Sequence, residues 1–179
     1  MASPTSPRSA RRLSLLSLLL SLGIGIGSTG CNNGGGGGSV TFDPAAFLGT
    51  WSGTWNNTTF SSSGAVTVVV STAGGTLTVT VDMDGGVFGG ADPAAESFNA
   101  TFSGTTATLT PQTSSVYGDV TATMNGNGQF TIQGANIPGS VDRFVLTGTW
   151  GATTINGAVT ITFDSSATAA GNATLNKQP

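Results

Sequence analysis

The side chains that could perform chemistry are few in this chain of 179 residues. It contains one cysteine, Cys31, and no histidine, so the commonest general base of enzymes is missing. A serine or threonine nucleophile would need a lysine, and the only one, Lys177, lies at the C-terminal end. The eight carboxylates could supply a glycosidase pair, but they fall mostly at predicted strand ends and turns. We therefore expect no catalytic residues and no enzymatic activity.

A group of acidic residues is the one candidate for binding a metal ion. The segment 82–86 resembles the start of a calcium-binding loop. Continuing the twelve-residue pattern places Val87 where the loop needs glycine and Pro93 where it needs a bidentate glutamate, which excludes a regular loop. An irregular site remains as the alternative to an ordinary strand end and turn; it would use Asp82, Asp84 and Asp92. The simpler interpretation predicts no metal and no cofactor.

The N-terminal segment has the order of a secretory signal. Three arginines without an acid come first, at positions 8, 11 and 12, and an apolar run follows over residues 13–26. Small residues lead from there to Cys31. The run of 14 residues is shorter than the roughly 20 that a membrane-spanning helix needs. An uncleaved N-terminal membrane anchor is the alternative. Arg11 and Arg12 are not followed by the phenylalanine typical of twin-arginine export, so the Sec route is favoured.

The end of this segment resembles the lipobox of bacterial lipoproteins, in which small residues precede a cysteine that is lipidated and becomes the new N-terminus. Thr29 and Gly30 fit this pattern, and Ser28 stands where the family usually has leucine. The resemblance implies removal of residues 1–30 and acylation of Cys31, for example with palmitate. It also implies sorting to the outer membrane, because Asn32 is not the aspartate that favours retention in the inner membrane. The side of the outer membrane that the protein would face, periplasmic or external, stays open.

Residues 31–41 are rich in glycine and are expected to form a flexible tether, and residues 42–179 form the predicted domain. After removal of the signal segment only Arg143 and Lys177 remain as bases, against eight acids, which gives a net charge of −6. Such a chain lacks the basic patch that nucleic-acid binding requires. The predicted partner is membrane lipid, contacted through the acyl chains alone.

Hydrophobic residues alternate with threonine, serine and asparagine almost throughout the predicted domain, as at 66–70, 77–83, 98–102 and 120–124. This period of two predicts half-buried β-strands, and the glycine- and asparagine-rich segments between them predict tight turns. We expect an all-β domain of eight to ten strands. A small antiparallel up-and-down β-barrel is the preferred architecture, and a β-sandwich is the alternative.

One dipeptide typical of a turn lies within this pattern of alternation. Asn156-Gly157 is typical of a hairpin, yet the alternation stays in phase across it. Residues 153–163 are therefore predicted to form one long strand, with Ile161 and Phe163 buried and Thr160 and Thr162 exposed.

Glycines alternate with large rings in two strands and favour the barrel. In residues 48–55, Trp51 and Trp55 share a face with Gly49 and Gly53, and Trp150 closes a similar pattern over residues 144–150. Such alternation suits the tapering interior of a small barrel. The three tryptophans are candidates for contacting a ligand, and the alternative is that they only fill a core.

Residues 42–51 resemble the opening motif of lipocalins, in which a helical turn plugs one end of the barrel and Gly-x-Trp begins the first strand. Gly49 and Trp51 match this motif, and avidin-type barrels begin similarly. In lipocalins a late arginine packs over that tryptophan. The resemblance implies that Arg143 pairs with Trp51 and that the cavity binds a small apolar ligand.

Three functions remain open at this point. The first is binding of a small apolar ligand in the barrel. The second is an envelope protein without a cavity that acts through contacts with other macromolecules. The third is a transmembrane barrel, against which the short predicted strands of six to eight residues and the lack of aromatic girdles argue.

Overall fold

The computed structural model describes residues 40–179. The predicted signal segment, Cys31 and the tether up to residue 39 lie outside the described residues. Within residues 40–179, two short 3-10 helices, η1 and η2, accompany eleven strands, so the prediction of an all-β domain is confirmed. No helix in the described part is long and apolar enough to cross a membrane. The elements are η1 (Pro44–Ala46), β1 (Gly49–Asn57), β2 (Ser62–Ala73), β3 (Thr76–Met83), η2 (Val87–Gly89), β4 (Glu96–Ser103), β5 (Thr106–Leu109), β6 (Gln112–Ser114), β7 (Gly118–Asn125), β8 (Gln129–Ala135), β9 (Val141–Trp150), β10 (Thr154–Phe163) and β11 (Thr168–Lys177).

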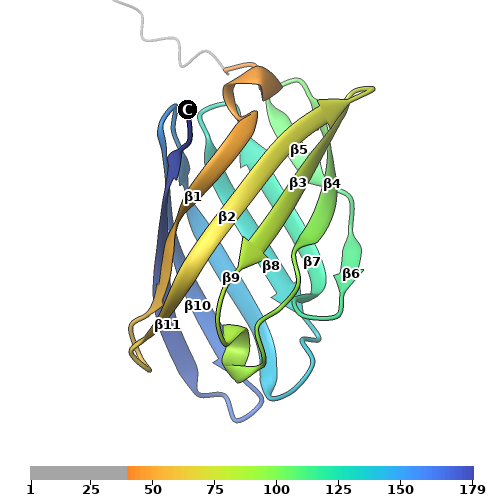
Figure 1. Cartoon of the computed structure of the whole chain (residues 1–179). Coiled ribbons are helices and arrows are strands. Elements are labelled where there is room, and N and C mark those ends of the chain that lie inside the picture. The colour runs from red at the N-terminus through yellow and green to blue at the C-terminus, as the bar shows by residue number, and fades with distance from the viewer. Residues whose placement is uncertain (1–39) are drawn as a thin grey trace, which may run out of the picture. The chain divides into compact units, whose positions relative to one another are not determined.

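The strands form one antiparallel sheet that closes on itself (Figure 1). Except for β5 and β6, strands adjacent in sequence pair with each other. β1 pairs with β11, and β5 pairs with β7 to complete a ring of ten strands. After β5 the pairing is interrupted at Pro111, which has no backbone N–H to donate. The next strand, β6, then pairs with the other end of β7. The architecture is the predicted up-and-down barrel and not the alternative sandwich.

The barrel is apolar inside and polar outside. The inward faces carry the hydrophobic core, whereas the outward faces carry mainly threonine, serine and asparagine. Outward side chains bond across strands, as between the Thr80 and Ser97 hydroxyls at 2.7 Å. Several strands are longer than the predicted six to eight residues, and β2 has twelve. A transmembrane barrel has an apolar outer face, so this distribution is the reverse of what that alternative requires.

The strand through Asn156-Gly157 is confirmed, because β10 runs unbroken and pairs with both β9 and β11. Ile161 is buried and Thr160 is exposed, as predicted. The alternation weakens at the end of the strand, where a bulge between Thr162 and Phe163 shifts the register and leaves both side chains half-buried.

One end of the barrel is closed by an aromatic cluster under η1. The Asp43 carboxylate accepts a hydrogen bond from the Ala45 N–H at 3.0 Å and caps η1, whose first residue is a proline. Phe47 and Trp51 lie beneath it, and the Trp51 indole N–H donates to the Phe47 carbonyl at 3.1 Å. The ring of Trp51 is fully buried and meets that of Trp150 edge-on at 5.3 Å.

The predicted pair of Trp51 and Arg143 is wrong. Arg143 is exposed on the outer face of β9, toward the end of that strand opposite Trp150. The cation over Trp51 is Lys177, whose Nζ lies 5.1 Å from the ring centroid. Lys177 is directly opposite Trp51 in the β1–β11 ladder, so both side chains point to the same side of the sheet.

Candidate functional site

The interior of the barrel holds a cavity of about 760 Å³. This lies within the range of about 300–1,000 Å³ typical of small-molecule sites. The cavity extends from the aromatic cluster at the closed end to the opposite end of the barrel, which we call the mouth. Its wall is almost entirely apolar, and among the described residues no charged side chain lines it.

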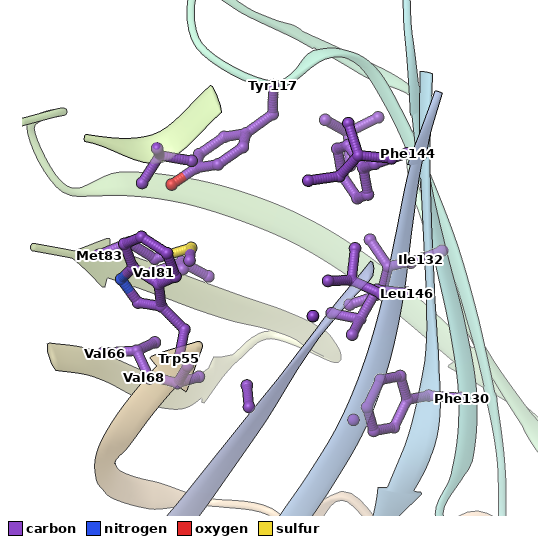
Figure 2. A pocket seen from close by; sticks show the side chains of 18 of the residues that line it. Trp55, Val66, Val68, Val81, Met83, Tyr117, Phe130, Ile132, Phe144 and Leu146 are labelled. Carbon is purple, nitrogen blue, oxygen red and sulfur yellow. The ribbon is translucent and has the colours of Figure 1, made fainter. Parts of the chain in front are cut away.

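Two facing walls give the cavity its shape (Figure 2). Aliphatic side chains of β2 and β3 form one wall, and larger side chains of β8 and β9 form the other. The space between them exists because neighbouring strands carry small residues at inward positions, such as Ala122, Gly157 and Ala173. The labelled wall residues are Val66, Val68, Val81, Met83, Phe130, Ile132, Phe144 and Leu146.

The three tryptophans proposed as ligand contacts have different positions. Trp55 and Trp150 line the cavity, whereas Trp51 lies beyond it in the closed end. The indole N–H of Trp55 donates to the Asp84 carbonyl at 2.9 Å, which fixes its ring against the mouth. The indole N–H of Trp150 is buried and has no acceptor among residues 40–179.

Tyr117 is a site residue that the sequence analysis missed. It belongs to the connection between β6 and β7, where the hydroxyl of buried Ser114 accepts a hydrogen bond from the Tyr117 N–H at 2.7 Å. This local bond and the positive φ of Gly118 turn the chain inward. Its hydroxyl points across the cavity toward β3, where Met83 lies (Figure 2).

The environment of Tyr117 keeps its phenol protonated. The side chain is only 7% exposed, and its hydroxyl forms no hydrogen bond with another described residue. Burial, followed by the negative charges of Glu96 and Asp82, raises the pKa of Tyr117 to about 12. The hydroxyl is therefore a free hydrogen-bond donor at any physiological pH.

The mouth is partly covered by the connection between β3 and β4, which contains η2 (Figure 1). Phe88 adopts a positive φ of 54°. Its ring stacks on that of Phe144 with 5.6 Å between the ring centroids, and it meets the ring of Tyr117 edge-on with 6.2 Å between the centroids. Phe60, which is 61% exposed, contacts Phe163 at 6.0 Å on the rim. An exposed aromatic rim leads from solvent to an apolar interior.

Two of the acidic residues considered for calcium, Asp84 and Asp92, instead form hydrogen bonds at the connection between β3 and β4. The Asp92 carboxylate accepts a hydrogen bond from the Gly85 N–H at 2.7 Å, and the Asp84 carbonyl holds Trp55. Within residues 40–179, no three acidic, cysteine or histidine side chains gather in a group that could hold a metal ion. The irregular site of Asp82, Asp84 and Asp92 is therefore not formed.

These features define a closed, ten-stranded antiparallel β-barrel with an apolar cavity, and solved structures share this fold. No family model and no curated protein matches the chain. It is similar to Rv2717c from M. tuberculosis, with 14% identity and a TM-score of 0.56 over 75% of this chain and 94% of that one. A protein of unknown function from the DUF3598 family of Nostoc punctiforme has 12% identity and a TM-score of 0.55. That match covers 78% of this chain and 50% of the other. At these identities the likeness shows the fold alone.

Proposed function

We propose that this protein is an envelope lipoprotein whose barrel binds a small apolar ligand. The observation that carries the proposal is the 760 Å³ cavity with an apolar wall. The lipocalin-like Gly49-Thr50-Trp51 start, placed under the plug formed by η1, supports the same function. The alternative of an envelope protein with a filled interior does not account for this space.

The energetics of the cavity favour ligands that are mostly hydrocarbon. Each Å² of apolar surface that leaves water contributes about 25 cal/mol, so burial of about 350 Å² of ligand surface contributes roughly 9 kcal/mol. Association costs at least about 4 kcal/mol of lost translational and rotational freedom. The remainder of about 5 kcal/mol is equivalent to a dissociation constant of roughly 0.2 mM.

Binding can be tested with the chain from Asn32 onward, because every pairing of the closed ring lies within residues 49–177. The probe is diphenylhexatriene, a hydrocarbon that fluoresces in apolar surroundings. We expect saturable binding, and we expect Ala122→Trp to weaken it by about tenfold or more, since a loss of about 1.4 kcal/mol has this effect. Ala122 faces the cavity, and its substitution by an indole fills part of the space.

Thr121→Trp is the matched control. Thr121 is exposed on the outer face of the same strand, so the added ring leaves the cavity unchanged. Equal probe affinity for both variants and the parent, or no binding by the parent, would contradict the proposed ligand site.

The anchor is tested through Cys31. Cys31→Ser removes the only thiol in the chain, and with it the atom that an acyl transfer would modify. We expect the variant to lose incorporation of labelled palmitate and to leave the membrane fraction, because attachment depends on the acyl chains. Cells expressing parent and variant are labelled and fractionated in parallel. Labelling and membrane association that survive the substitution would overturn the lipoprotein proposal.

A further inference from the structure

Tyr117 presents to the apolar cavity a hydroxyl that has no hydrogen-bond partner among residues 40–179, whereas the unpaired indole N–H of Trp150 is itself buried at the closed end. Other polar side chains near the cavity, such as those of Asn57 and Ser140, belong to the rim and are half-buried or exposed. Tyr117 is 7% exposed, and its hydroxyl is directed into the cavity (Figure 2). This hydroxyl is open to the cavity, so it can donate a hydrogen bond to an acceptor on a bound ligand. A ligand without an acceptor would displace water from the hydroxyl and leave its hydrogen bond unreplaced.

The charges around the cavity restrict what this acceptor can be. Neither basic residue of the described chain reaches the wall: Arg143 is on the outer face, and Lys177 lies over Trp51 at the closed end. The charged groups that act on Tyr117 are the carboxylates of Glu96 and Asp82. A ligand carboxylate would leave water for a cavity without a cation and would be repelled by these acids.

We propose that Tyr117 donates a hydrogen bond to an uncharged oxygen of the ligand, so that the cavity selects neutral long-chain alcohols or esters over the corresponding carboxylates. This inference rests on the proposed function and adds the chemical class of the ligand. Tyr117 lies near the mouth beside Phe88, and the wall toward Phe130 and Trp150 is apolar. The ligand is therefore oriented with its oxygen near the mouth and its chain toward the closed end.

The test compares dodecan-1-ol, methyl dodecanoate and dodecanoate at pH 8 as competitors of diphenylhexatriene. With the parent chain from Asn32 onward, we expect the alcohol and the ester to bind at least about 30-fold more tightly than the carboxylate, because only the ion pays an uncompensated desolvation cost. Titration calorimetry with the alcohol gives its affinity directly, without the probe.

Tyr117→Phe removes only the hydroxyl and keeps the ring. We expect it to weaken binding of the alcohol and the ester by about 3- to 10-fold, the effect of one lost hydrogen bond. Binding of diphenylhexatriene, which has no acceptor, should stay unchanged. The inference fails if the carboxylate binds as well as the alcohol, or if the variant binds all three competitors like the parent while the hydrocarbon still binds. Failure of the parent to bind both the hydrocarbon and the alcohol would instead remove the proposed function and the inference with it.

Discussion

Trp51→Ala is expected to lower the free energy of unfolding by about 3–5 kcal/mol, because it removes a large buried ring and leaves a cavity. The ring is 0% exposed, and its contacts include the perpendicular ring of Trp150 and the Phe47 carbonyl. The loss is a large part of the roughly 5–15 kcal/mol that stabilises a typical domain. Truncation also leaves the Phe47 carbonyl without its donor, and the Lys177 ammonium without the aromatic face that it covers.

Thr50→Ala is the control for this substitution, because Thr50 precedes Trp51 in β1 and is exposed on the outer face. We expect a change within about 0.5 kcal/mol for Thr50→Ala. Urea denaturation of the chain from Asn32 onward, followed by circular dichroism, measures both variants. A Trp51→Ala variant as stable as the parent would show that the closed end does not depend on this ring.

Gly148→Ala is expected to destabilise the barrel by about 1–3 kcal/mol or more, the usual cost of forcing atoms into a packed interior. A Cβ at this position would lie 2.1 Å from the Asn156 carbonyl oxygen and 2.9 Å from the Gly157 Cα. Both are backbone atoms of the neighbouring strand, so the two strands would have to separate. The Phe130 ring, 2.7 Å from the same Cβ, would also have to move.

Gly157→Ala provides a close comparison, since Gly157 is the direct partner of Gly148 in the β9–β10 ladder. Its Cβ would meet only the end of the flexible Leu146 side chain closely, at 2.9 Å, with other atoms at 3.6 Å or more. We expect a clearly smaller loss of stability, which the same denaturation experiment measures. Equal losses for the two variants would show that backbone contact is not what requires glycine at position 148.

The fold was predictable from the sequence because each barrel strand has one face exposed to solvent and one face buried in the barrel. This difference produces the alternation that identified the strand through Asn156-Gly157. The glycine of the 144–150 pattern also had the predicted role, since Gly148 makes room for the Phe130 ring. Strand ends were less predictable, because bulges such as that at Phe163 change which face a side chain occupies.

The errors at the candidate site come from contacts that the sequence does not encode locally. Arg143 was assigned to Trp51 by resemblance, whereas the cation that covers the ring is the one in register with it across β1 and β11. Tyr117 lies in an irregular connection without alternation, so no periodic signal distinguishes an inward side chain from an outward one there. Only the local bond to Ser114 indicates its direction.

The chain reaches the barrel at its closed end. Phe42 N–H donates to the Gly104 carbonyl at 2.9 Å, in the turn between β4 and β5, and η1 follows directly. The mouth is at the other end of the strands. A strand such as β9 has ten residues, so at about 3.3 Å per residue it is roughly 30 Å long. If Cys31 is the lipid attachment point, as we propose, the anchored segment is joined to the barrel at the end opposite the mouth. A ligand of the proposed kind would then enter the barrel at the end that is not joined to the anchor.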